Sequence, residues 1–404
     1  MAQFLQRFRR ILTFIRTGWS IAGVTLAAML VTEAGFRLVF AIKDHFAAVQ
    51  TPDRRVIDAG YGGEAWPVQH YRELLSLEER WEPYVYFRQK PFSGQTISVD
   101  PEGLRLTWQP PPAPADGTQA RAFKVLMLGG SSLWGFGARN DRTIPSHLAR
   151  TLYEQGHRVE VRNLAEIGYV STQEVVALVR ELQSGYRPDL VIFYDGVNDT
   201  TSAFLEGEAG LTTNERNRRA EFNIRQSPSR LGASLIARLV ADSASYRFAQ
   251  VIGRRLTRNA GQSRLPSGDR SRELAGDVVR RYCANLEIVE KLGKGFGFDA
   301  LHYWQPVVFD KSSLTPFERE ELERFAWARG FFRAVAEEIR RTSELETNPR
   351  FHDLGRLFAD SKDLVFIDYC HTTESGNETI AQAMARDAAG VLLRRDDRRR
   401  TPIP

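Results

Sequence analysis

The stretch Phe123–Gly135, with the sequence FKVLMLGGSSLWG, decides the fold class of this chain. Its first half is a short apolar run that ends in two glycines, as a buried strand does where it enters a turn. Helix-like stretches separate this run from later ones, so the alternation predicts an α/β fold, a parallel sheet with crossover helices. The later runs are Val159–Val161, Leu190–Tyr194, Leu301–Trp304 and Val365–Ile367.

Helices are expected between these runs, and one interval is unusually long. From about Thr201 to Phe298 the chain exceeds what a single crossover needs, so we expect inserted helices that form a lid or a wall of a site. The expected helices are Ile144–Glu154, Thr172–Ser184, a long one within 216–256, Arg272–Leu292, Pro316–Arg341 and Ser375–Leu393.

The charge of the chain lies mainly in its two ends. Lys and Arg number 55 against 50 Asp and Glu, a net charge of +5. Three arginines fall in residues 1–10 and five in residues 394–400. A nucleic-acid-binding domain needs its positive charge on a folded face, so this distribution argues against nucleic acid as a partner. The two cysteines, Cys283 and Cys370, leave one disulfide or two free thiols open.

The N-terminal region has the composition of a membrane span. Thr17–Thr32 carries no formal charge, and apolar residues resume at Leu38–Ile42. Glu33 and Arg37 lie between them at i,i+4, where they can pair on one helix face. We therefore predict one spanning helix over residues 17–42. Arginines precede it, which favours a cytoplasmic N-terminus and places the rest of the chain on the outer side, periplasmic or extracellular. The alternative is a cleaved signal peptide.

These features divide the chain into five parts. A basic tail covers residues 1–16 and the membrane anchor residues 17–42. An accessory segment follows over residues 43–118 and closes with the proline-rich stretch Gln109–Ala115, which favours an extended spacer. The α/β domain is expected over residues 119–396 and a tail over residues 397–404.

Residues with acyl-transfer chemistry follow the predicted strands. Ser131 follows the first, Gly168 the second and Asn198 the third, while Asp368 and His371 follow the last. The carboxyl ends of parallel strands meet at one edge of a sheet, so these residues are expected together. A serine hydroxyl needs an imidazole base, and a carboxylate fixes the imidazole tautomer. The backbone N–H groups of Ser131 and Gly168 and the Asn198 amide are the candidate oxyanion donors.

The same residues resemble the blocks of the SGNH/GDSL hydrolase family. Gly129–Gly135 is similar to the Gly-Asp-Ser-x-x-x-Gly block, with Gly130 in place of aspartate and Ser132 as a second candidate serine. Gly168 resembles the oxyanion glycine, and Gly196–Asp199 matches Gly-x-Asn-Asp. Asp368 and His371 have the spacing of the last block. The resemblance implies a three-layer, flavodoxin-like α/β/α domain with ester-hydrolysing or acyl-transferring activity.

The predicted function is that of a membrane-anchored serine esterase outside the cytoplasm, with O-acyl groups of cell-surface carbohydrate as the expected substrate. One alternative is an O-acyltransferase that works with a multi-spanning partner supplying the acyl donor. Another is a noncatalytic, membrane-tethered binding protein with the same fold. No zinc-type ligand spacing and no phosphate-binding loop occur, so neither a metal nor a cofactor is expected.

Aromatic residues near the predicted strand ends have two interpretations. They either line a cleft that stacks on sugar rings or belong to the core, where most such residues are found. These residues are Trp134, Phe136, Tyr169, Tyr194 and Trp304.

Overall fold

The computed structural model describes residues 2–50, 61, 64–111, 121–225, 243–246 and 268–400. The chain forms two compact units, one of residues 1–52 and 216–264 and the other of residues 53–215 and 265–404. The first contains α1 (Ala2–Gln50), whose segment Thr13–Ala41, 29 residues long, has the length and the average composition to cross a membrane. A stretch of this length and composition serves either as an anchor or as a signal sequence.

The second unit contains a five-stranded parallel sheet with the order β6-β5-β7-β8-β9. Numbered along the chain, this order is 2-1-3-4-5, which is the flavodoxin-like arrangement. The predicted fold class is therefore confirmed. The strands are β5 (Phe123–Gly129), β6 (Val159–Asn163), β7 (Leu190–Asp195), β8 (Asp299–Trp304) and β9 (Phe351–Asp353).

One predicted strand is wrong. The fifth strand is β9, and residues 365–367 form only an isolated bridge between Phe366 and Thr372. The buried carboxylate of Glu318 accepts hydrogen bonds from the backbone N–H groups of Val365, at 3.1 Å, and Phe366, at 3.2 Å. Because a side chain takes these two donors, the apolar run lies in a tight loop instead of extending the sheet.

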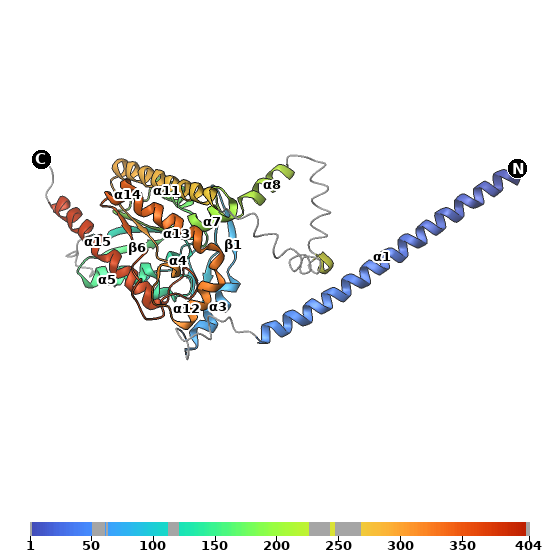
Figure 1. Ribbon diagram of the computed structural model, residues 1–404, viewed down its shortest axis with the longest axis horizontal. Coiled ribbons are helices and arrows are strands. Elements are labelled where there is room, and N and C mark those ends of the chain that lie inside the picture. The colour runs from blue at the N-terminus through green and yellow to red at the C-terminus, as the bar shows by residue number, and fades with distance from the viewer. Residues whose placement is uncertain are drawn as a thin grey trace. The chain divides into compact units, whose positions relative to one another are not determined.

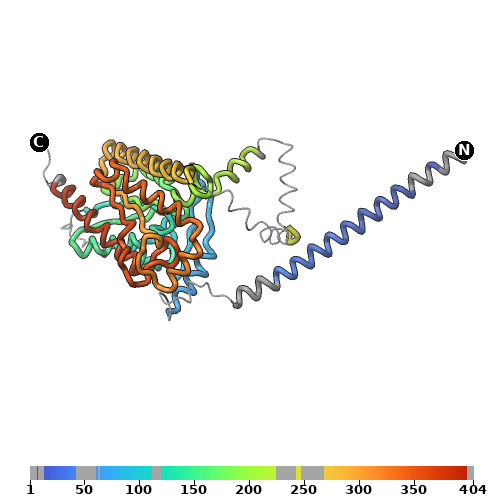
Figure 2. Tube along the Cα trace, in the orientation of Figure 1, coloured from blue at the N-terminus to red at the C-terminus, as the bar shows by residue number. Residues whose placement is uncertain are grey.

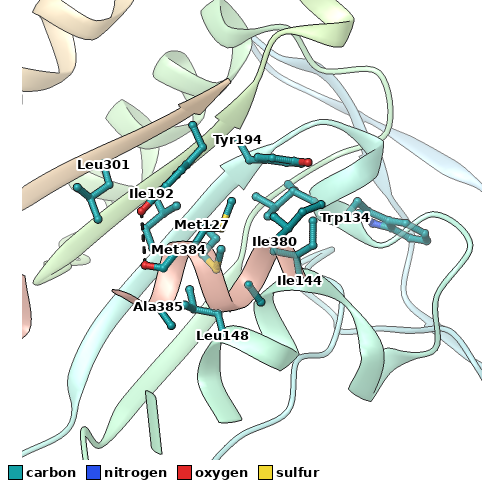
Figure 3. Packing of buried hydrophobic residues seen from close by; sticks show 14 of the residues in the cluster. Met127, Trp134, Ile144, Leu148, Ile192, Tyr194, Leu301, Ile380, Met384 and Ala385 are labelled. Carbon is teal, nitrogen blue, oxygen red and sulfur yellow. Dashed lines mark hydrogen bonds between the residues drawn. The ribbon is translucent and has the colours of Figure 1, made fainter. Parts of the chain in front are cut away.

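Helices cover both faces of the sheet, which gives the three layers that the resemblance implies. Val125 and Met127 of β5 belong to one core cluster with α5 (Ile144–Glu154) and α15 (Glu374–Arg400), whereas Leu126 and Leu128 belong to another with α6 (Ser171–Gln183) and α11 (Asp269–Phe296). Figure 1 shows α11 and α15 on opposite sides of the sheet, and Figure 3 shows the first cluster from close by. The alternation follows from the two-residue side-chain period of a strand.

Most of the predicted helices are present with small shifts of their ends. The segment 316–341 forms two helices, α12 (Pro316–Arg324) and α13 (Ala326–Arg341), separated by Phe325. The interval 201–298 includes α8 (Glu215–Arg225), all of α11 and most of α7 (Val197–Glu206). Much of the long helix expected within 216–256 falls outside the described residues. The remaining short helices are α4 (Ser131–Trp134), η1 (Asn140–Arg142), η3 (Val308–Asp310) and α14 (Ser343–Glu346).

Residues 64–111 belong to the same compact unit as the sheet. Figure 2 follows their trace along this unit. They form α3 (Trp66–Ser76) and two antiparallel pairs, β1 (Glu79–Glu82) with β2 (Tyr86–Gln89) and β3 (Phe92–Ser93) with β4 (Ser98–Val99). The accessory segment is thus folded onto the α/β domain over its described part.

Candidate active site

Ser131 lies where β5 turns into the short helix α4. β5 ends at Gly129, Gly130 is extended, and Ser131 is the first residue of α4. The backbone N–H of a first helical residue has no partner within its own helix, so it can donate to a ligand. The turn therefore holds both the hydroxyl and the N–H of Ser131 at the carboxyl edge of the sheet.

The structure brings three of the predicted side chains into one hydrogen-bonded chain. The Ser131 Oγ lies 2.7 Å from His371 Nε2, and His371 Nδ1 lies 2.6 Å from Asp368 Oδ2. The other carboxylate oxygen of Asp368 accepts from the backbone N–H groups of Cys370, at 2.9 Å, and His371, at 2.8 Å. Both oxygens of Asp368 are thereby fixed, which sets the orientation of the imidazole.

The neighbours of Asp368 keep its carboxyl group ionised. Burial alone would raise its pKa, but the charge and hydrogen bond of His371, together with the backbone N–H groups of His371 and Cys370, lower the pKa of Asp368 to about 2. A carboxylate in this state accepts the Nδ1–H of the imidazole and stabilises a positive charge on that ring.

The choice between the two adjacent serines is decided by their contacts. Ser131 contacts His371, whereas Ser132 is buried. The Ser132 hydroxyl donates to the carbonyl of Cys370, at 3.4 Å, and accepts from the side-chain amide of Gln305, at 3.2 Å. Of the two, Ser131 is the one placed for proton transfer to an imidazole.

The two other predicted donors lie at the neighbouring strand ends. Gly168 has a φ of +84°, and a Cβ there would meet open space, so the backbone conformation explains the glycine. The Asn198 amide donates to the carbonyl of Tyr169 at 2.7 Å. A Cβ added at Gly130 would stand 2.0 Å from the nitrogen of this same amide. Asn198 therefore lies against the serine turn, in space that the aspartate of the family block would crowd.

The groups that would contact a substrate are partly exposed, and the carboxylate that orients His371 is buried. Ser131, Gly168, Asn198 and His371 are half-buried, whereas Asp368 is buried. Four of the five aromatic residues near the strand ends are core residues, namely Trp134, Tyr169, Tyr194 and Trp304. The cleft interpretation is wrong for these four.

The fifth aromatic residue, Phe136, packs on the imidazole. Its ring is stacked on His371 with centroids 4.3 Å apart and an angle of 28° between the planes. The loop that carries Phe136 is held by Arg105, which donates to the carbonyl oxygens of Gly135, at 2.8 Å, and Ala138, at 2.6 Å. The Arg105 guanidinium also lies over the Trp134 ring, 4.3 Å from its centroid. Nothing in the sequence around Arg105 signals this contact.

One group of potential metal ligands occurs at the same place. Atoms of Asp368, Cys370 and His371 lie within 4.8 Å of one another. Asp368 and His371 are already in direct hydrogen-bond contact, which an ion between them would have to break. Their geometry fits proton transfer better than metal coordination. Cys283 and Cys370 are both free thiols.

No protein-family model matches this chain, and no curated protein does. Among solved structures it is similar to the acetyl xylan esterase AlAXEase, with 12% identity, coverage of 65% of this chain and 98% of that one, and a TM-score of 0.35. The lipase Lip_vut3 from a goat rumen metagenome has 15% identity, coverage of 66% and 97%, and a TM-score of 0.37. A G-D-S-L family lipolytic protein from Veillonella parvula has 12% identity, coverage of 68% and 100%, and a TM-score of 0.36.

Proposed function

We propose that this chain is a serine esterase in which Ser131 is the nucleophile, His371 the base and acid, and Asp368 the residue that orients His371. The observation that carries this proposal is the continuous chain of hydrogen bonds, 2.7 Å from Ser131 to His371 and 2.6 Å from His371 to Asp368. Proton transfer by a positioned imidazole requires contacts of about 2.6–3.2 Å, and both contacts fall in this range.

The reaction follows from this arrangement. His371 Nε2 takes the proton of Ser131 as the oxygen attacks the ester carbonyl, and Asp368 stabilises the resulting imidazolium. The negative charge on the carbonyl oxygen is met by the N–H groups of Ser131 and Gly168 and by the Asn198 amide. His371 then protonates the leaving alcohol, an acyl group remains on Ser131, and water activated by the same imidazole releases the acid.

The proposed substrates are O-acyl groups of carbohydrate outside the cytoplasm. Support comes from the N-terminal apolar helix and from the arginines that precede it, which favour an outward-facing active site. Acyl groups on cell-surface glycans are esters that a membrane-anchored enzyme on that side can reach.

The proposal is tested with the full chain in detergent and p-nitrophenyl acetate as substrate. We expect Ser131→Ala and His371→Ala to lower kcat by about 10³-fold or more, while Ser132→Ala, the matched control, retains most of it. A fluorophosphonate probe should label the wild type and the Ser132→Ala variant but not Ser131→Ala.

Two other results would favour a different function. Folded wild type that neither reacts with the probe nor turns over the ester would favour a noncatalytic binding protein. Labelling of Ser131 without hydrolysis would favour transfer of the acyl group to a sugar hydroxyl instead of water.

A further inference from the structure

The hairpin formed by β1 and β2 is fixed to the loop that carries Gly168. The backbone N–H of Gln89 donates to Glu166 at 3.0 Å, and the Gln89 side-chain amide donates to the same carboxylate at 3.2 Å. The Tyr169 hydroxyl donates to the carbonyl of Phe87. Glu166 and Tyr169 lie on either side of Gly168 in the sequence, so the hairpin and this candidate oxyanion donor share one rigid support.

The outer part of this hairpin exposes two large aromatic side chains. Trp81 is 69% exposed and Tyr84 is 80% exposed. Phe87 and Gln89, by contrast, are held against the α/β domain. The exposed rings thus belong to a hairpin whose strand β2 contacts the loop that carries Gly168.

The backbone at this turn indicates that the Tyr84 side chain is used, whereas the Tyr86 hydroxyl donates to Glu215 and its ring packs on Trp81 within the fold. Tyr84 has a φ of +67° and Tyr86 a φ of +76°. Glycine adopts this left-handed conformation freely, whereas a residue with a Cβ does so at a cost. Because most of the Tyr84 side chain is in solvent, packing within the fold does not offset that cost. Strained positions of this kind are concentrated at binding sites.

The charges around the rings identify the kind of ligand. Residues 78–90 contain three acidic and three basic side chains, so the hairpin has no net charge. Ion pairs join Glu78 to Lys90 and Glu82 to both Arg80 and Arg180. An anionic membrane surface or an acidic polymer would favour uncompensated Lys or Arg. A neutral polar ligand with an apolar face fits better.

We propose that Trp81 and Tyr84 form a subsite for a neutral glycan chain, whose sugar rings stack on the two aromatic side chains while an ester on the same chain reaches Ser131. This inference rests on the proposed function. The C–H face of a pyranose ring loses water against an aromatic ring, which makes an exposed aromatic side chain a suitable contact for a neutral sugar.

The test compares a polymeric and a small substrate on the full chain in detergent. The polymers are O-acetylated xylan, O-acetylated glucomannan and O-acetylated chitin fragments, and the small ester is p-nitrophenyl acetate. Trp81→Ala and Tyr84→Ala are expected to raise KM for at least one polymer by about threefold to tenfold each. They should leave kcat/KM for p-nitrophenyl acetate within about twofold. Leu75→Ala, which removes an exposed aliphatic side chain from α3, is the control and should change neither.

A second variant separates ligand binding from folding. Tyr84→Gly relieves the left-handed strain, so its thermal unfolding midpoint should equal or exceed that of the wild type even as KM for the polymer rises. Trp81→Phe keeps a ring and should recover part of the affinity. A fall in stability for Tyr84→Gly with equal loss on both substrates would mean a structural role and overturn the proposal.

The remaining outcomes are also decisive. Unchanged KM on all three polymers would overturn the subsite. Quenching of Trp81 fluorescence by brominated lipids in nanodiscs, lost in Trp81→Phe, would assign the rings to the membrane instead. Glycan binding by the Ser131→Ala variant, measured by affinity electrophoresis, tests the subsite independently of catalysis. Binding that depends on Trp81 in a chain without esterase activity would therefore refute the proposed function while leaving the subsite in place.

Discussion

Asp368 and the pair Glu174 and Asp195 are buried carboxyls at the same edge of the sheet, and their pKa values are shifted in opposite directions. Asp368 has a backbone N–H or an imidazole at each oxygen, and its pKa is lowered to about 2. Glu174 and Asp195 are equally inaccessible, but among the described residues no donor reaches any of their four oxygens. Burial raises the pKa of Asp195 to about 8 and that of Glu174 well above its ordinary value.

The difference shows that hydrogen-bond donors, more than the extent of burial, set the direction in which the pKa of a buried carboxyl shifts here. Glu174 and Asp195 lie close enough to hydrogen-bond each other, which requires that one of them keep a proton. Asp199, nearby on α7, is fixed by the backbone N–H and hydroxyl of Ser171, the hydroxyl at 2.6 Å. Asp368 is thus suited to stabilise a positive charge on His371, whereas Asp199 joins the start of α7 to the start of α6.

The largest expected effect comes from replacing Asp368 and Asp195, one at a time, by asparagine. Asp368→Asn should lower kcat by about 10⁴-fold, because an amide disfavours the tautomer that can accept the serine proton. Asp195→Asn should lower it far less, since a neutral group already fits that position. The measurement is kcat for p-nitrophenyl acetate on the full chain. Equal losses in the two variants would show that the distinction between the two groups is wrong.

Asn198 follows Asp195 closely in the sequence and lies at the start of α7. Asn198→Ala removes the proposed side-chain donor to the oxyanion and should lower kcat by about 10²–10³-fold. KM should change little, because the donor acts mainly in the transition state. A variant in which KM rises and kcat stays constant would instead assign Asn198 to substrate binding.

Phe136 contacts the face of the imidazole, whereas Asp368 holds its edge. Phe136→Ala should lower kcat by about twofold to tenfold, since one aromatic contact orients the ring less strongly than the Asp368 hydrogen bond does. Phe136→Tyr keeps the ring and should retain most activity. Stopped-flow acylation rates measure the effect, and identical rates in all three proteins would remove Phe136 from the positioning of His371.

The smallest expected effect concerns stability. Because the folded pKa of Asp195 is raised to about 8, the folded chain binds more protons than the unfolded chain between about pH 4 and 8, and stability falls as pH rises through this window. Glu174→Gln supplies an amide donor to Asp195 and should flatten the pH dependence of the unfolding midpoint. A slope equal to that of the wild type would rule out the shared proton.

The sequence predicts the parts of the site that are local in the chain. Ser131, Gly168 and Asn198 follow the ends of β5, β6 and β7 within a few residues, so the positions of three strands predict that they lie at one edge of the sheet. Asp368 and His371 lie in hydrogen-bond contact with one another and with Ser131 although their segment is a loop and not the expected strand. The Glu318 carboxylate binds the backbone just before them.

What the sequence could not predict depends on contacts between distant residues. Arg105 reaches the Phe136 loop from a segment with no recognisable motif. The pairing of Glu174 with Asp195 joins a helix to a strand end, and each residue looks ordinary alone. The role of the five aromatic residues near the strand ends depends on their burial, which the sequence does not reveal. Four of the five are core residues.

The central claim is that an acyl group is held on Ser131, and the most direct test is to find that group. The full chain is mixed with p-nitrophenyl acetate, quenched in acid within milliseconds, digested and analysed by mass spectrometry. We predict an acetyl group on the peptide that contains both serines, located on Ser131 by fragmentation and absent from Ser131→Ala. Acetyl groups on Ser132 or Cys370 alone, or full turnover in Ser131→Ala, would contradict the account.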